Sequence, residues 1–278
     1  MWMSRRRSIV QNAKLKMEGK APFGTDEYIG EPKYDGIRAK IVKDGSKVKV
    51  LSRYGNDITS EFPELASAAR KQLRGSVEVD GEITMPGSRW AALISKLKSV
   101  KHPKAGKVQF HAFDIMKHRN KSVETQPLLE RKKLLRDSLK RGTIIKNTPY
   151  VRHPLKKHYK KYLKQGHEGT VLKKATSPYR RGKRTIDWIK VRKEIPIDAK
   201  IVGMKETPKG KMSFKLVDKK GNSLGLASAA KLDRYQRKAL IDLIRRGRKP
   251  EVEVKGRSIT AKHKVRHPRI TRVRLDLQ

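Results

Sequence analysis

The sequence predicts an α+β fold in two domains, the second of which is a small β-barrel. The chain of 278 residues is long enough for two domains of ordinary size. Runs with the period of strands are interspersed with amphipathic helical stretches, an order typical of antiparallel sheets with helices packed on them. Because Pro196 interrupts the pattern directly after an expected strand, we place the first domain at 28–194 and the second at 195–278.

A basic N-terminal arm is expected before the first domain. Residues 1–27 are basic at first and then contain Gly19, Pro22 and Gly24, which favour loops. We expect a loosely ordered segment or a short helix here.

The first domain should begin with a hairpin and continue with helices and strands. Residues 38–42 and 47–51 are predicted strands joined at Asp44-Gly45. Ser60 is positioned to cap a helix over 61–73. The remaining elements are expected as strand 77–83, helix 88–98, strand 108–115, helix 127–139, strand 144–151, helix 155–163 and strand 169–173.

The second domain is predicted to hold five short strands and one helix. The strands are expected at 199–204, 213–217, 223–226, 251–254 and 270–275, and the helix at 232–244. This number and order of elements fit a small barrel of the oligonucleotide-binding type, or OB-fold.

The charge balance indicates a polyanionic partner. The chain has 70 Lys and Arg against 27 Asp and Glu, a net charge of +43. Nucleic acid is the first candidate, and a ribosomal or chromatin-type protein and a membrane-surface binder are alternatives. No run of about 18 apolar residues is present, and the first residues lack the apolar core of a secretory signal. We therefore expect a soluble intracellular protein.

The residue types exclude several kinds of chemistry. The chain has no cysteine, which rules out disulfides, thiol catalysis and cysteine-bound zinc. The eight histidines lack the spacing of metal ligands, so we interpret them as structural or phosphate-facing.

One short motif points to covalent chemistry. The run Lys33-Tyr34-Asp35-Gly36-Ile37-Arg38 has the pattern Lys-x-Asp-Gly-x-Arg, in which the lysine can carry a nucleotide. The alternative is a solvated turn in which glycine supplies a permissive backbone. In so basic a chain this pattern can arise by chance, so the interpretation depends on further motifs.

Five further motifs follow in order along the chain. They are Ser52-Arg53-Tyr54-Gly55, Asp80-Gly81-Glu82, Phe110-His111-Ala112-Phe113-Asp114, the pair Glu168-Gly169-Thr170-Val171-Leu172-Lys173 and Asp187-Trp188-Ile189-Lys190-Val191-Arg192, and Arg272-Val273-Arg274-Leu275-Asp276. Together with the first motif they resemble the covalent nucleotidyltransferases, and specifically the ATP-dependent DNA ligases. The resemblance covers most of residues 28–276 and implies an adenylyltransferase domain with ATP-grasp-like antiparallel sheets, followed by an OB-fold.

The resemblance also implies roles for individual residues. Lys33 would attack the α-phosphate of ATP and hold AMP, Phe113 would stack on the purine, and Glu82 and Glu168 would bind Mg²⁺ or Mn²⁺. The other implied nucleotide contacts are Glu31, Arg38, Arg53, Glu82, Lys173, Lys190 and Arg192.

The sequence departs from the family pattern at two positions. Arg192 stands where the family often has a lysine, which keeps the charge but not the geometry. The closing motif of Arg274 and Asp276 is followed by Leu277, where the family has a lysine. In the family this motif orients the pyrophosphate leaving group, so the efficiency of the first step is open.

The function that the resemblance implies is the sealing of nicked double-stranded DNA by a minimal, monomeric ligase without a membrane role. It would act on DNA in the cytoplasm of a bacterium or of a virus-infected cell. An RNA ligase of the same superfamily is the nearest alternative. A GTP-using capping enzyme, a NAD-dependent ligase and a non-catalytic nucleic-acid-binding protein on this fold are further ones.

Overall fold

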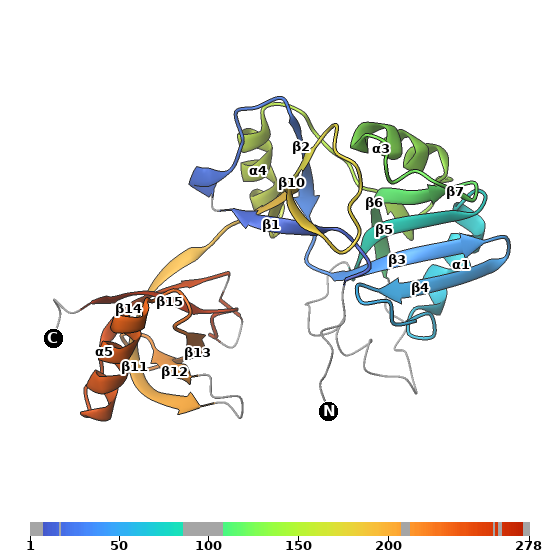
Figure 1. Ribbon diagram of the computed structural model, residues 1–278. Coiled ribbons are helices and arrows are strands. Elements are labelled where there is room, and N and C mark those ends of the chain that lie inside the picture. The colour runs from blue at the N-terminus through green and yellow to red at the C-terminus, as the bar shows by residue number, and fades with distance from the viewer. Residues whose placement is uncertain are drawn as a thin grey trace. The chain divides into compact units, whose positions relative to one another are not determined.

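The computed structural model describes residues 8–16, 18–85, 108–206, 212–257, 259–260 and 263–274 (Figure 1). By their internal contacts the residues divide into two units, Met1–Arg192 and Lys193–Gln278. This division falls two residues before the expected boundary between residues 194 and 195. None of the helices described is long and apolar enough to cross a membrane. The helix expected at 88–98 lies outside the described residues.

The first unit contains two sheets. One has four strands in the order β1 (Asn12–Lys16), β10 (Arg184–Arg192), β9 (Gly169–Lys174) and β2 (Tyr28–Lys33). The other has the order β4 (Lys47–Ser52), β3 (Ile37–Asp44), β5 (Val77–Thr84), β6 (Gln109–His118) and β7 (Lys121–Ser122), with β8 (Ile145–Asn147) paired to β6. Pairing is antiparallel except for β1 with β10 and β6 with β8, so the expectation of antiparallel sheets is largely confirmed.

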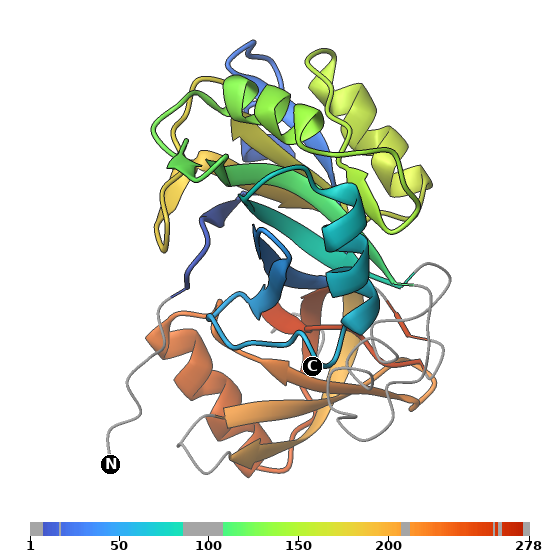
Figure 2. The ribbon, with the colours of Figure 1, turned by 90° about the vertical axis from the view of Figure 1, so that its right-hand side faces the viewer.

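Helices cover one face of each sheet because apolar side chains alternate along the strands. The six-stranded sheet packs its core, including Ile41 and Val79, under α1 (Pro63–Gln72), as Figure 2 shows from the side of that helix. The four-stranded sheet packs Leu172 and Ile189 against α4 (Leu155–Lys164). Helix α3 (Leu128–Asp137) packs on β6, and a short 3₁₀ helix, η1 (Glu18–Lys20), follows β1. The opposite faces carry charged side chains together with aromatic ones such as Phe113 on β6 and Trp188 on β10.

Several expectations for the first unit need correction. Residues Asn12–Lys16 of the expected arm form β1, because their backbone pairs with β10 far along the chain. Ser60 does not cap α1: its hydroxyl donates to Glu61 at 2.8 Å, and the helix begins after Phe62 with a proline in its first turn. The strand expected at 144–151 ends at Asn147, just before Thr148-Pro149.

The second unit is a closed barrel of five strands. The order is β11 (Ile195–Glu206), β12 (Met212–Val217), β13 (Ser223–Ser228), β15 (Arg269–Arg274) and β14 (Glu251–Gly256). Inward side chains such as Ile201, Phe214 and Val254 fill it, together with Leu240 from α5 (Arg234–Arg245). Asp233 and Gln236 cap this helix reciprocally. All five expected strands and the expected helix are therefore present.

Candidate active site

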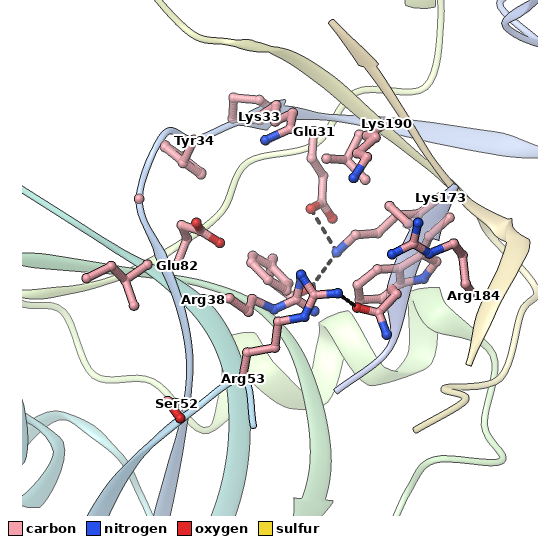
Figure 3. A pocket seen from close by; sticks show the side chains of 18 of the residues that line it. Glu31, Lys33, Tyr34, Arg38, Ser52, Arg53, Glu82, Lys173, Arg184 and Lys190 are labelled. Carbon is pink, nitrogen blue, oxygen red and sulfur yellow. Dashed lines mark hydrogen bonds and ion pairs between the residues drawn. The ribbon is translucent and has the colours of Figure 1, made fainter. Parts of the chain in front are cut away.

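The first unit contains a cavity of about 550 Å³ that is lined from both of its sheets (Figure 3). Eight of the residues singled out in the sequence line it: Glu31, Lys33, Arg38, Arg53, Glu82, Phe113, Lys173 and Lys190. Strand alternation explains this gathering. On β9 and β10, Lys173, Trp188 and Lys190 face the cavity. Their neighbours Leu172 and Ile189 point to the other side of the sheet and pack against α4.

Lys33 ends β2 and forms an ion pair beside the cavity. Its Nζ lies 2.5 Å from Oε2 of Glu168, and the two side chains are 20% and 14% exposed. The backbone supports the pair because the amide of Glu168 donates to the carbonyl oxygen of Lys33 at 3.1 Å. Arg192 reaches the same carboxylate, with Nη1 at 3.7 Å from Oε1. Glu168 and Arg192 thus adjoin Lys33, although they are not among the cavity-lining residues.

Glu31 is buried between two lysines. Its Oε2 lies 2.9 Å from Nζ of Lys173, and its Oε1 lies 2.5 Å from Nζ of Lys132. All three side chains are at most 4% exposed. Sequence reasoning missed Lys132, which α3 buries together with Arg131. Their spacing of three and four residues from the buried Leu128 is the signal that could have placed both on the inner face.

The aromatic wall of the cavity is in contact with cations. Nζ of Lys173 lies 4.2 Å from the ring centre of Phe113 and 3.9 Å from that of Trp188. The guanidinium of Arg38 lies 4.5 Å from the Phe113 ring. Burial, with a contribution from nearby Lys132, lowers the pKa of Lys173 to about 8. Trp188 also lines the cavity, a role that its motif in the sequence did not predict.

Arg38 is held by a buried carboxylate rather than left mobile. Its Nε and Nη2 each donate to Asp80 at 2.6 Å, and the hydroxyl of Tyr179 donates to the same carboxylate at 2.7 Å. This bidentate geometry fixes the plane of the guanidinium. Arg38 therefore contributes a fixed positive charge to the cavity.

Two further ionisable groups of the cavity have shifted pKa values. Burial raises the pKa of Glu82 to about 7, against the opposing effect of Arg38 and Lys33. Burial, together with the charges of Lys33 and neighbouring arginines, lowers the pKa of Lys190 to about 8. The site thus holds a carboxyl and an amine that change charge close to neutral pH, which is common at functional sites.

Tyr34, next to Lys33, is locked in an aromatic cluster. Its ring stacks on His111 with centres 3.8 Å apart and meets His167 edge-on at 5.3 Å. Burial lowers the pKa of His111 to about 4, so this imidazole is neutral at physiological pH. The stack holds the chain on the C-terminal side of Lys33.

Three of the predicted residues remain to be described: Arg53, which lines the cavity, and the two residues of the closing motif. Arg53 donates a hydrogen bond to Asn12 of β1, a strand that sequence reasoning did not foresee. Arg274 lies in the second unit, where its Nη2 is 2.7 Å from Oδ1 of Asp198. Asp276 lies outside the described residues. In the part of the chain that is described, no three His, Cys, Asp or Glu side chains group as a ready-made metal site.

Replacing Gly36 by alanine is expected to disturb the site. A Cβ at Gly36 would lie 2.1 Å from the carbonyl oxygen of Ile83 and 2.8 Å from Cγ of Glu82. We expect a loss of about 1–3 kcal/mol in unfolding free energy. In thermal or urea unfolding the control Gly24→Ala, where nothing lies within 4 Å, should change little. An equally stable Gly36→Ala protein would contradict the close approach.

A lysine paired with a carboxylate, beside an aromatic-walled cavity rich in cations, defines this as a candidate site for nucleotide transfer onto lysine. The family model described as the ATP dependent DNA ligase domain matches residues 9–192. The chain belongs to this family.

Curated relatives carry the same family name. The chain is 32% identical to the SPbeta prophage-derived DNA ligase-like protein LigB of Bacillus subtilis over 185 residues, which are 62% of this chain and 63% of that protein. It is 30% identical to a DNA ligase of Archaeoglobus fulgidus over 174 residues, 58% of this chain and 31% of that one. The chain thus spans between about a third and two thirds of these relatives.

Solved structures of DNA ligases share the fold. The mycobacterial DNA ligase D complexed with ATP matches with a TM-score of 0.57 and 18% identity, over 98% of this chain and 96% of that one. A Lig E DNA ligase matches with a TM-score of 0.69 and 21% identity, over 95% of this chain and 98% of that one. At this identity the likeness concerns the fold, which includes both units.

Proposed function

We propose that this protein is an ATP-dependent DNA ligase that seals nicks through AMP bound to Lys33. The observation that carries the proposal is the Lys33–Glu168 pair at 2.5 Å beside a cavity lined by cations and aromatic rings. Membership of the ATP dependent DNA ligase domain family supports ATP as the nucleotide.

The cavity suits the nucleotide in size and in chemistry. Its volume of about 550 Å³ lies within the usual range for small-molecule sites. Phe113 and Trp188 would contact the purine, whereas Arg53, Arg184 and Lys190 would face the phosphates. Stacking on Phe113 competes with Arg38 and Lys173, which already lie over that ring. Purine binding therefore involves a shift of at least one of these cations.

The first step needs an uncharged amine on Lys33. A lysine is mostly protonated at neutral pH, and Glu168 is within hydrogen-bonding distance to take the proton. The free amine then forms a bond to the α-phosphorus while the bond to pyrophosphate breaks. Lys190 and Arg53 would offset the charge that develops on the phosphates.

The two later steps transfer the AMP and close the nick. The 5′-phosphate at the nick takes the AMP from Lys33, and the adjacent 3′-hydroxyl then attacks this activated phosphate and displaces AMP. Both are in-line transfers at phosphorus, so alignment and charge neutralisation supply the catalysis. Each strand end must therefore be held rigidly against the cavity.

Glu82 and Glu168 would hold a divalent metal ion. Mg²⁺ usually takes only one or two protein carboxylates and completes its shell with phosphate oxygens and water. A pair of carboxylates therefore fits, even without a larger ligand cluster among the described residues. When bound, Mg²⁺ or Mn²⁺ would neutralise phosphate charge.

The second unit is assigned to duplex binding. Its closed five-stranded barrel with one helix fits the OB-fold. The net charge of +43 suits contacts to the DNA backbone that do not depend on sequence. Arg274 and Asp276 would act on pyrophosphate, with Leu277 in place of the family's lysine. We expect the protein to work as a monomer.

Labelling with nucleotide tests this proposal. The purified protein is incubated with α-³²P-labelled ATP or GTP and Mg²⁺, and denaturing electrophoresis shows whether label stays attached. We expect an adduct with ATP only. The absence of an ATP adduct would refute the lysyl-AMP step. Faster sealing of a nicked RNA duplex than of a nicked DNA duplex would favour an RNA ligase instead.

Metal binding is expected to weaken as the pH falls through about 7. Because burial raises the pKa of Glu82 to about 7, a metal ion must displace a proton from this carboxyl at lower pH. The affinity for Mn²⁺, measured by titration of the AMP-bearing protein, should rise with pH and level off above about 8.

Two variants separate this effect from general acid sensitivity. Glu82→Gln should remove the pH dependence. Glu124→Gln, which changes a carboxylate paired with Arg181 at 2.7 Å outside the cavity, should keep it. A pH dependence that survives in Glu82→Gln would show that another group controls the metal.

A further inference from the structure

Helix α4 carries a dense basic surface that the proposed reaction does not use. Its sequence, LKKHYKKYLK, contains five lysines and no acidic residue. All five are exposed: Lys156, Lys157, Lys160, Lys161 and Lys164. We refer to them as the α4 lysines.

The α4 lysines share one side of the helix. With 3.6 residues per turn they fall within an arc of about 140°. The opposite side holds the buried residues Leu155, Tyr159 and Tyr162. From Lys156 to Lys164 the helix rises about 12 Å, a length over which one DNA strand presents three to four phosphates. The spacing is therefore suited to a phosphate backbone.

This basic surface faces away from the cavity. The buried side of α4 packs with Leu172, Ile189 and Val191 of the four-stranded sheet. The neighbouring residues on the same strands, such as Lys173 and Lys190, line the cavity on the other face of that sheet. Figure 1 shows α4 beside β2 and β10. DNA held at the cavity mouth would thus lie across the sheet from the α4 lysines.

The fold does not account for these charges. Lysines four apart, such as Lys156 and Lys160, repel each other and destabilise the helix. Within the described residues, no ion pair joins any α4 lysine to an acidic side chain. The buried side alone anchors the helix, so uncharged polar residues would serve the outer side equally well. A polyanion that covers the surface would remove the repulsion.

We propose that the α4 lysines bind the phosphate backbone of a second double-stranded DNA segment, so that one protein molecule bridges two duplexes. Because this surface and the cavity lie on opposite faces of one sheet, both can be occupied together. The proposal goes beyond nick sealing: it rests on the proposed function for the binding of the first duplex, but it does not depend on chemistry at Lys33.

The test compares two triple variants of equal charge. Lys156→Gln/Lys160→Gln/Lys164→Gln removes three charges from the surface and keeps good helix formers. The control Lys71→Gln/Lys121→Gln/Lys133→Gln removes three exposed charges that are dispersed over α1, β7 and α3. Bead-bound nicked duplex is loaded with protein, washed, and offered a labelled intact duplex at several salt concentrations.

The wild type and the control should retain the labelled duplex, and the α4 variant should retain at least about tenfold less of it. The slope of log affinity against log salt for the second duplex should fall by about 2 to 3 in the α4 variant. Labelling by ATP, which needs no DNA, should be equal in all three proteins and so reports separately on the proposed function.

Three results would overturn the proposal. The first is full retention of the second duplex by the α4 variant, and the second is an equal loss of that duplex in the control. The third is that the α4 variant no longer binds anionic phosphatidylserine vesicles but still bridges two duplexes. The last result would assign the surface to membranes.

Discussion

Lys33→Ala is expected to abolish the attachment of AMP to the protein, a loss on the order of 10⁴-fold or more in adduct formation. The amine of Lys33 would be the attacking atom, and Arg192 is the other cation described beside Glu168. Guanidinium groups such as that of Arg192, 3.7 Å from Glu168, stay protonated and are not nucleophiles. The measurement is label retained on the protein after incubation with radioactive ATP.

Two further variants control for folding and for charge. Lys33→Arg keeps a cation beside Glu168 and should also form no adduct. Lys14→Ala removes an exposed lysine of β1 and should label normally. An adduct that persists in Lys33→Ala would place the nucleophile elsewhere.

Asp114→Asn is expected to lower the unfolding free energy by about 3–5 kcal/mol, the largest stability effect that we predict. Asp114 accepts hydrogen bonds from Nε and Nη2 of Arg131 at 2.8 and 2.9 Å, and both side chains are 0% exposed. The substitution leaves a fully buried guanidinium without its counter-charge. Urea unfolding monitored by tryptophan fluorescence measures the effect.

Asp137→Asn is the matched control for this loss. Asp137 is 55% exposed and lies 3.9 Å from Arg136, so its pairing energy is screened by water. We expect a change below about 0.5 kcal/mol. Equal stability of the two variants would contradict the account of the buried pair.

The strands and the motif residues of the cavity were predictable because their signals are local. Alternating apolar residues placed β3, β4 and the five barrel strands close to where they occur. The same alternation turns Lys173 and Lys190 towards one cavity, so their gathering follows once the strands are paired.

What sequence reasoning missed depends on partners far away in the chain. Strand β1 has little strand signal of its own and is defined by pairing with β10, more than 150 residues later. Considered within α3 alone, Lys132 and Arg131 have the character of solvent-exposed charges. They are buried because they pair with Glu31 of β2 and Asp114 of β6. Ser60 is a good capping residue in isolation, but Pro63 sets the start of α1. Local propensity could not reveal these pairings.

The most direct test of nick sealing uses protein that already carries labelled AMP and is freed of ATP. On addition of a nicked duplex with a 5′-phosphate, we predict that the label leaves Lys33, passes through an AMP-capped DNA strand and ends as free AMP, with one strand sealed per AMP released. Label that stays on the protein, or leaves it without a sealed strand, would contradict the account.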